Sequence, residues 1–207
     1  MYYIQDESSA LAAHALQVKP GQLVYDLCSA PGGKTTHMAQ LMEDRGRILA
    51  FDVNQARLKL VQANAQRMGI SIIETRLGDA SEDLGLAPAP RVLVDAPCSG
   101  LGTMGHRPDI RWRKNLDDIL ELAALQKRIL SAAASYVAPG GLLLYSTCTL
   151  TKYENEDVAQ WFLDNHREFQ GHVFPSWFPP SAGPNWMRTI LPHRHGLDGF
   201  FLAIFRK

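Results

Sequence analysis

The sequence contains little cysteine and no excess of charge of either sign. Three cysteines, Cys28, Cys98 and Cys148, occur among 207 residues, and 21 basic residues balance 21 acidic ones. An odd number of widely spaced cysteines argues against a disulfide framework and for a reducing compartment, so we expect a cytoplasmic location. None of the cysteines forms a C-x-x-C pair, and we therefore expect no metal site.

Long apolar segments and a secretory signal pattern are also missing. No apolar run is long enough to span a bilayer, and the start, MYYIQDESSA, lacks a basic-then-apolar pattern. We therefore expect no membrane partner. The length of 207 residues and the apolar content of 46% fit one well-filled domain, residues 1–207, which we expect to be a monomer.

Two nucleotide-binding fingerprints are absent from the segment YDLCSAPGGKTTHMA, residues 25–39. A phosphate-binding loop needs a glycine at position 28, which holds Cys28, and the dinucleotide pattern G-x-G-x-x-G does not occur. What is present is a strand that ends near Asp26, a Gly-rich turn, a helix from about Gly33 and a second strand that ends at Asp52. An acidic residue at that place commonly binds ribose hydroxyls, so the loop suits a nucleoside-bearing ligand without a pyrophosphate.

Short apolar strands alternate with amphipathic segments along the chain. We predict strands near 22–27, 47–52, 71–76, 91–95 and 141–147, and helices near 5–17, 33–43, 54–68, 116–137 and 153–166. This alternation is typical of an α/β fold with a mostly parallel central sheet and helices on both faces.

The predicted helix ends and the last part of the chain carry further signals. Asn115 is a good cap for the fourth helix, and Thr151 with Glu154 has the spacing of a capping box for the fifth. We therefore favour a structural role for Glu154 over catalytic support. After about residue 167, the segments FQGHVF and GFFLAIF predict an antiparallel hairpin at the edge of the sheet.

Polar residues recur where the predicted strands end. These residues are Asp26, Cys28, Asp52, Asp79, Asp95 and Cys148. Ligands of open α/β sheets bind outside the carboxyl ends of the strands, so the recurrence predicts a site there.

Cys98 and Cys148 both follow strand ends. A free cysteine is more often a small buried apolar residue than a reactive one. Here Cys98 lies in a Pro-Cys-Ser-Gly turn and Cys148 lies between two threonines, and turns at strand ends are where reactive groups are placed. A nearby cation would hold either sulfur as the thiolate, which is the nucleophilic form.

Two basic features have two interpretations each. Lys34 in the first turn of a helix opposes the helix dipole, which indicates either a compensating anion or a side chain that extends into water. The loop GHRPDIRWRKN places Arg107 and Arg111 beside Trp112, a mixture that suits an RNA backbone and a stacked base. The same loop also fits a solvated connection, and we favour RNA because it follows the Cys98 turn.

Taken together, these motifs resemble the Sun-type RNA (cytosine-5) methyltransferases, a class I S-adenosylmethionine family. The resemblance covers nearly the whole chain. It rests on QDESS (5–9), DLCSAPGGKT (26–35), FDVN (51–54), GDA (78–80), DAPCSG (95–100), RPDIRW (107–112), STCTL (146–150), ENE (154–156) and DGFF (198–201).

The resemblance implies a Rossmann-like fold and a set of site residues. It implies S-adenosylmethionine on the loop of Cys28, Ser29, Ala30, Pro31, Gly32, Gly33 and Lys34, with Asp52, Arg57, Asp79 and Asp95 as further cofactor contacts. It implies Cys148 as the nucleophile and Cys98 as the residue that helps to release the product, with Asp95 and Lys34 also catalytic. Arg107, Arg111 and Trp112 are the expected RNA contacts.

The implied reaction is methylation of carbon 5 of a cytosine in RNA. The thiolate adds to carbon 6, which makes carbon 5 nucleophilic enough to accept a methyl group. We expect ribosomal RNA of the small subunit (16S) first and tRNA second, with a non-catalytic RNA-binding module as the alternative. Members of the family usually carry an additional RNA-binding region, which we expect to be absent here because QDESS is so close to the start.

Overall fold

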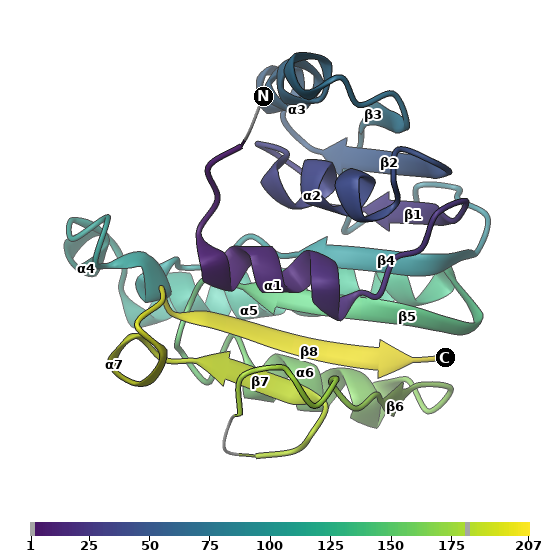
Figure 1. Ribbon diagram of the computed structural model, residues 1–207. Coiled ribbons are helices and arrows are strands. Elements are labelled where there is room, and N and C mark those ends of the chain that lie inside the picture. Colours follow the sequence, from purple (N-terminus) through teal and green to yellow (C-terminus); the bar gives the residue numbers. More distant parts are fainter. Residues whose placement is uncertain (1–2, 181–182) are drawn as a thin grey trace.

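The computed structural model describes residues 3–180 and 183–207, which form a central sheet with helices on both faces (Figure 1). The sheet contains eight strands within the described residues, in the order β3-β2-β1-β4-β5-β8-β6, and β7 also pairs with β8. The strands are β1 Leu23–Asp26, β2 Arg47–Asp52, β3 Ile73–Leu77, β4 Ala89–Asp95, β5 Val137–Thr147, β6 Gln170–Gly171, β7 Met187–Ile190 and β8 Phe200–Arg206.

The helices cover both faces of this sheet. They are α1 Glu7–Ala15, α2 Gly33–Leu41, α3 Gln55–Met68, α4 Ile110–Arg113, α5 Leu116–Ser135, α6 Glu156–Asn165 and α7 Pro192–His195, with a 3-10 turn, η1, at Leu101–Thr103. Helices α1 and α2 pack on one face, and α5 and α6 pack on the other (Figure 1). No helix in the part of the chain that the structure describes is long and apolar enough to cross a membrane.

The first five strands run parallel, so their carboxyl ends meet at one edge. β1 pairs with β2 and β4, and β4 pairs with β5 in a register that sets Asp95 opposite Ser146. β8 runs antiparallel to β5, with Phe201 opposite Thr147. This arrangement confirms the predicted Rossmann-like α/β class with its antiparallel C-terminal strands.

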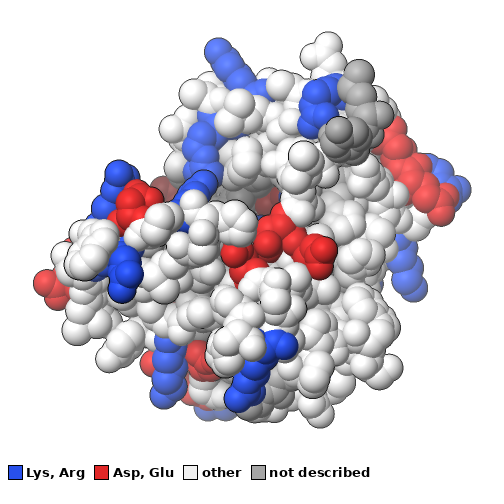
Figure 2. Space-filling model, turned by 60° about the vertical axis from the view of Figure 1, so that its left-hand side comes forward, with Lys and Arg blue, Asp and Glu red and all other residues white. Residues whose placement is uncertain are grey.

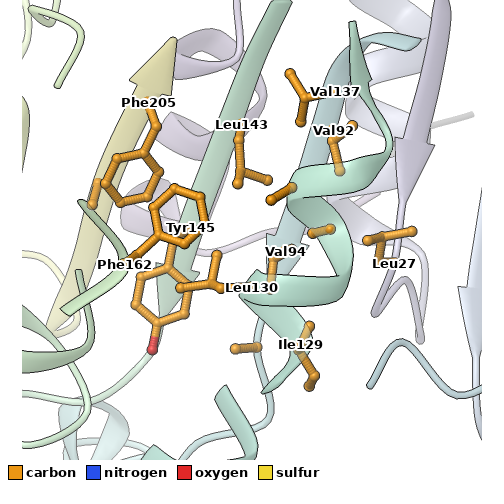
Figure 3. Packing of buried hydrophobic residues seen from close by; sticks show 14 of the residues in the cluster. Leu27, Val92, Val94, Ile129, Leu130, Val137, Leu143, Tyr145, Phe162 and Phe205 are labelled. Carbon is orange, nitrogen blue, oxygen red and sulfur yellow. The ribbon is translucent and has the colours of Figure 1, made fainter. Parts of the chain in front are cut away.

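Alternate residues of the central strands fill two separate cores, because successive side chains of a strand point to opposite faces. Val92, Val94 and Leu143 belong to the core under α5 and α6, together with Leu130 and Phe162 of those helices (Figure 3). Leu93, Leu142 and Leu144 belong to the core under α1 and α2. Burial on both faces explains why these strands are apolar throughout.

Two helices start at asparagine caps, of which the sequence predicts the one at Asn115. The Asn54 side chain accepts hydrogen bonds from the backbone N–H of Ala56 (2.9 Å) and Arg57 (3.1 Å) at the start of α3. Asn115 and Asp118 form a reciprocal capping box at the start of α5. Both caps satisfy backbone donors that have no partner inside the helix.

The capping box predicted at Thr151 and Glu154 is wrong. Helix α6 begins at Glu156, and the preceding Asn155 makes no side-chain cap. The Asn155 side chain instead accepts from Thr147 Oγ1 (2.6 Å) and donates to the Thr149 carbonyl (3.0 Å). Glu154 is fully buried and turns toward the Cys98 turn.

The C-terminal hairpin is confirmed, but it is one part of a larger arrangement. β6 pairs with β8 as predicted, over Gln170–Gly171 only. The unpredicted strand β7 also pairs with β8, from Met187 opposite Ala203 to Ile190 opposite Phe200.

The predicted helix at 116–137 ends at Ser135, because Val137 already pairs with Ala89 of β4.

Candidate active site

The polar residues at the strand ends surround two adjoining hollows. A cavity of about 430 Å³ is lined by Cys28, Ala30, Asp52, Arg57, Asp79, Asp95, Cys98 and Cys148, among others. A second hollow of about 230 Å³ is lined by Asp26, Cys28, Ser29, Ala30, Pro31, Gly33, Lys34 and Asp95, together with residues of the segment before α1. The strand register thus brings together residues from five separate parts of the sequence.

The loop between β1 and α2 is held close to the sheet. The backbone N–H of Ser29 donates to the Phe51 carbonyl of β2 (2.7 Å), and that of Gly32 donates to the Ser29 carbonyl (2.8 Å). Gly32 has a φ of +104°, and a Cβ on it would lie 3.1 Å from the Cα of Val61. Glycine therefore fits this position for two reasons, backbone conformation and close contact with α3. Of the seven loop residues predicted to hold a ligand, Gly32 alone lines neither hollow.

Asp26 lies under this loop with one oxygen unused. Its Oδ2 accepts a hydrogen bond from Thr35 Oγ1 (2.7 Å), while Oδ1 has no partner. The buried Ser29 hydroxyl also lacks a partner. Burial raises the pKa of Asp26 to about 7, and the neighbouring charge of Asp95 acts in the same direction. Buried polar groups normally have partners, so the two orphaned atoms indicate a place for polar groups of a ligand.

The end of β2 is tied to the same loop through Arg57. Asp52 Oδ1 accepts from the backbone N–H of Asn54 (2.9 Å), and its Oδ2 lies 3.6 Å from Arg57 Nη1. Arg57 Nη2 donates to the Ala30 carbonyl (2.6 Å). Arg57 therefore fixes the spacing between the loop and the Asp52 carboxylate on one side of the cavity.

Asp79 follows β3 and is held as an anion by its own turn. Its Oδ1 accepts from the backbone N–H (2.8 Å) and the hydroxyl (2.7 Å) of Ser81. These hydrogen bonds lower the pKa of Asp79, with the backbone contribution the larger.

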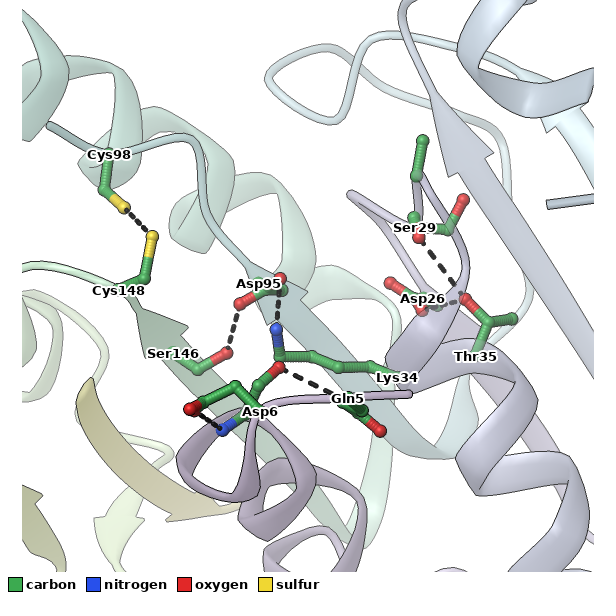
Figure 4. A network of polar contacts seen from close by, with 12 residues as sticks. Gln5, Asp6, Asp26, Ser29, Lys34, Thr35, Asp95, Cys98, Ser146 and Cys148 are labelled. Carbon is green, nitrogen blue, oxygen red and sulfur yellow. Dashed lines mark hydrogen bonds and ion pairs between the residues drawn. The ribbon is translucent and has the colours of Figure 1, made fainter. Parts of the chain in front are cut away.

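Lys34 has a counter-ion at the end of β4. Its Nζ lies 2.7 Å from Asp95 Oδ2, and Ser146 Oγ donates to Asp95 Oδ1 (2.8 Å; Figure 4). Burial acts to lower the pKa of Lys34, but the charge of Asp95 and its hydrogen bond outweigh burial, so the net shift is upward. An anion thus accounts for a cation in the first turn of α2.

The two thiols predicted to react lie side by side. Cys98 Sγ and Cys148 Sγ are 3.4 Å apart, at the ends of the neighbouring strands β4 and β5 (Figure 4). The hydrogen bond from Cys98 lowers the pKa of Cys148 against the effect of burial, and the charge of Lys34 acts in the same direction. The same hydrogen bond, together with burial, raises the pKa of Cys98 well above its ordinary value. A lowered pKa favours the thiolate form of Cys148, and the thiolate is the nucleophilic form.

Cys28 differs from this pair. Burial raises the pKa of its thiol well above the ordinary value, and the carboxylates of Asp26, Asp95 and Asp52 add to the shift. A thiol surrounded by acids stays protonated, so Cys28 belongs to the lining of the cavity rather than to its reactive groups.

The structure also shows polar residues that the sequence did not single out. The Ser146 hydroxyl donates to Asp95, the Ser99 hydroxyl donates to Glu154, and the Gln126 amide donates to the Pro97 carbonyl (2.9 Å) and to Glu154 (3.1 Å). Ser146 and Ser99 lie within the STCTL and DAPCSG motifs, whereas Gln126 lies inside a helix, where nothing local marks it.

The predicted RNA contacts are not part of the cavity. Arg107, Arg111 and Trp112 do not line it, and Trp112 is 82% exposed on α4 with the Arg111 guanidinium 5.2 Å from its ring centre. Figure 2 shows the face onto which the strand ends open: acidic side chains gather near its centre, and Lys and Arg side chains lie around its margins. Among the described residues, no group of three or more His, Cys, Asp or Glu is placed to hold a metal ion.

Known proteins share these features over almost the whole chain. The family described as 16S rRNA methyltransferase RsmB/F matches residues 13–206. The "Probable ribosomal RNA small subunit methyltransferase B" of Synechocystis is 42% identical over 99% of the chain, which covers 47% of that protein. The tRNA (cytosine(72)-C(5))-methyltransferase of Pyrococcus horikoshii is 35% identical over 100% of the chain and 52% of that protein.

A solved structure agrees with these relatives. NSun6 from Pyrococcus horikoshii, solved with SFG, has a TM-score of 0.90 and 35% identity, and the match covers 99% of this chain and 53% of that chain. The chain thus spans about half the length of the relatives that it matches. Because a family match over residues 13–206 and relatives above 30% identity over nearly the whole chain agree with the shared fold, the chain belongs to the RsmB/F family of 16S rRNA methyltransferases.

Proposed function

We propose that this chain transfers a methyl group from S-adenosylmethionine to carbon 5 of a cytosine in RNA, through a covalent bond between Cys148 and the base. The names of its relatives support both the RNA substrate and the methylated atom, because they include rRNA methyltransferases and a tRNA (cytosine-C5) methyltransferase. The observation that carries the proposal is the thiol pair, 3.4 Å apart, with Lys34 and Asp95 beside it.

The residues around the cavity fit the cofactor. The orphaned Asp26 Oδ1 and Ser29 Oγ suit its amino-acid end, and the Asp52 carboxylate suits ribose hydroxyls. Asp79 and the apolar part of the cavity suit the adenine. When bound, the cofactor supplies an electrophilic methyl group on a sulfonium. Its positive charge agrees with the acidic surroundings of the cavity. The related NSun6 was solved with SFG, an S-adenosylmethionine analogue, which also supports this cofactor.

Cys148 starts the reaction. Carbon 5 of cytosine is a poor nucleophile, so the Cys148 thiolate adds to carbon 6, forms a C6–S bond and moves the electrons of the C5–C6 double bond onto carbon 5, which becomes enamine-like. Carbon 5 then takes the methyl group as the methyl–sulfonium bond breaks and leaves a neutral thioether, and it holds both the methyl and its original proton. A base removes this proton, the double bond forms again, and the C6–S bond breaks to return the thiolate.

Asp95 and Cys98 act in the first and last steps of this reaction. Asp95 is fixed by Lys34 and Ser146, and its carboxylate accepts a hydrogen bond from the amino edge of the cytosine or from its protonated ring nitrogen. Cys98 keeps its proton at neutral pH because its pKa is raised, and it assists the release of the product. Lys34 stays cationic and favours the thiolate form of Cys148.

The RNA must present an unpaired cytosine. The atoms that react are stacked inside a helix, so the base has to be flipped out or lie in a loop. Arg107, Arg111 and Trp112 offer guanidinium groups and an exposed ring for the neighbouring backbone and a stacked base. We place ribosomal RNA of the small subunit first, and tRNA second.

The test uses RNA with tritium on carbon 5 of cytosine. We expect the chain with S-adenosylmethionine to release tritium from a small-subunit rRNA transcript faster than from a tRNA transcript, and calorimetry to detect S-adenosylmethionine binding but no NAD binding. A chain that binds the cofactor but releases no tritium at saturating RNA overturns the proposal in favour of a non-catalytic RNA-binding module. Faster release from tRNA reverses the order of the two substrates.

A further inference from the structure

A buried carboxylate lies behind the two thiols and takes no part in the steps above. Glu154 is 0% exposed. Its Oε1 accepts from the backbone N–H of Ser99 (2.8 Å) and from Gln126 Nε2 (3.1 Å), and its Oε2 accepts from Ser99 Oγ (2.5 Å) and Thr151 Oγ1 (2.8 Å). Four donors therefore converge on one side chain, a complete set for a carboxylate.

This network joins the two cysteine turns. Ser99 follows Cys98, Thr149 follows Cys148, and the two hydroxyl oxygens are 2.7 Å apart. Because the Ser99 hydroxyl donates its single hydrogen to Glu154, the Thr149 hydroxyl must donate to Ser99. The backbone N–H of Gly102 also donates to the Cys148 carbonyl (2.9 Å). Hydrogen bonds thus join the two turns on both sides of the thiol pair.

We propose that Glu154 is a positioning residue that holds the Cys98 turn against the Cys148 turn, at the separation where the Cys98 thiol donates to the Cys148 sulfur. The inference rests on the proposed role of Cys148 as the nucleophile. Glu154 does not touch either sulfur, and it acts through Ser99 and Thr149.

The geometry separates this indirect action from a direct charge effect. The groups that face Cys148 are the Cys98 thiol from the turn after β4, Asp95 from the end of β4 and Lys34 from α2. The hydrogen bond from Cys98 is the largest influence that favours the Cys148 thiolate. A hydrogen bond between sulfurs weakens when the turns separate, so loosening the Glu154 network removes this influence without changing the charges of Asp95 and Lys34.

The experiment measures the reactivity of Cys148 in the protein without RNA or cofactor. The chain is alkylated with iodoacetamide across a range of pH, and modification of Cys148 is followed by mass spectrometry of its peptide. In Glu154→Gln we expect the midpoint of reactivity to rise by about one pH unit, a roughly ten-fold loss of thiolate at pH 7. Ser99→Ala should give a similar shift, and the double variant should add little, because both changes break one network.

Tyr145→Phe is the matched control. The Tyr145 hydroxyl donates to the backbone carbonyl of Glu154 (2.6 Å), so this variant loses a buried hydrogen bond to the same residue and leaves the carboxylate contacts in place. We expect its Cys148 midpoint to equal that of the native chain. An unshifted midpoint in both Glu154→Gln and Ser99→Ala, or an equal shift in Tyr145→Phe, overturns the inference. If Glu154→Gln does not fold, Ser99→Ala decides.

This readout also separates the inference from the proposed function. Alkylation needs no methyl transfer, so a shifted midpoint in a chain that releases no tritium leaves the positioning role intact and removes the reaction. Tritium release by the native chain, together with an unshifted midpoint in Glu154→Gln and Ser99→Ala, supports the reaction and removes the positioning role.

Discussion

The edge of the sheet where the parallel strands end has two halves, one at β1 and β2 and the other at β4 and β5. Both halves carry buried acids, but the hydrogen bonding of these acids differs. In the first half, Asp26 keeps an oxygen without a partner, and the nearby Ser29 hydroxyl is also unpaired. In the second half, both oxygens of Asp95 are paired, the Cys98 and Cys148 sulfurs contact each other, and Glu154 has four donors.

One edge of the sheet thus serves two tasks. A buried polar atom without a partner is costly, and a ligand that supplies the partner recovers that cost, so the β1–β2 half is suited to binding. Groups that are already paired are held in fixed positions before a substrate arrives, which is what a reacting site requires. We therefore expect substitutions in the two halves to affect different measurements.

The largest effect is expected for Cys148→Ala. The variant lacks the sulfur that we propose attacks carbon 6, so tritium release should fall by about 10³-fold or more, while cofactor affinity stays within about two-fold of native. Tritium release and calorimetry measure the two quantities. Full activity of this variant would remove Cys148 from the mechanism.

Cys98→Ala should be nearly as damaging, but with a different signature. In the proposed mechanism, attack and methyl transfer do not need the Cys98 thiol, whereas release does, so we expect a protein–RNA adduct that persists on a denaturing gel. Loss of the hydrogen bond to Cys148 also raises the pKa of the nucleophile, which slows formation of the adduct at low pH. The double variant with Cys148→Ala is the control and should give no adduct.

Asp52→Ala should act on binding alone. Loss of hydrogen bonds from the carboxylate to the cofactor ribose should weaken cofactor binding by about 1–3 kcal/mol, and saturating cofactor should restore most of the tritium release. Glu74→Ala, at an exposed acid on β3, serves as the control and should leave the dissociation constant unchanged. An Asp52 variant with native affinity contradicts the assignment.

The smallest effect on the rate at saturating cofactor is expected for Asp26→Asn, whose signature is the pH dependence of stability. The folded-state pKa of Asp26 is about 7, against an ordinary value of 3.8, so the folded chain binds more protons than the unfolded chain between these values. Stability should therefore fall as the pH rises from about 4 to about 7 and level off above that range. Asparagine has no such penalty.

Thermal unfolding at pH 5 and pH 8 tests this sign. We expect the Tm of Asp26→Asn, relative to native, to be higher at pH 8 than at pH 5 by a few degrees, on the order of 1 kcal/mol or more. Thr35→Val keeps the carboxyl group but removes its hydrogen-bond donor, which raises the pKa of Asp26 further, so the fall of stability should extend to higher pH. Parallel curves for native and Asp26→Asn would show that Asp26 titrates normally.

Much of the architecture follows from local sequence patterns. RVLVD and GLLLYS are apolar strands that end in polar residues, so their spacing alone places Asp95 and the Cys148 turn at one edge of a parallel sheet. The position of Lys34 in its helix allows either an anion or water as its surroundings, and the structure shows that the partner is Asp95. These features depend on neighbouring residues and on one rule about strand ends.

The features that were missed depend on partners far away in the sequence. Thr151 and Glu154 have the spacing of a capping box, but the Glu154 carboxylate binds Ser99, which lies 55 residues away. The β7 strand MRTI is short and contains a buried arginine, so its apolar pattern is weak until β8 is present to pair with it. Local periodicity does not record such pairings.

The position of β8 has a consequence for synthesis on the ribosome. A nascent chain that has reached the end of α6 already contains Cys98, Cys148 and Glu154, yet one edge of β5 stays unpaired until Phe200–Arg206 has been made. An open, apolar strand edge invites pairing with other chains, so the interval between α6 and β8 is the period in which translation leaves this protein most exposed to aggregation.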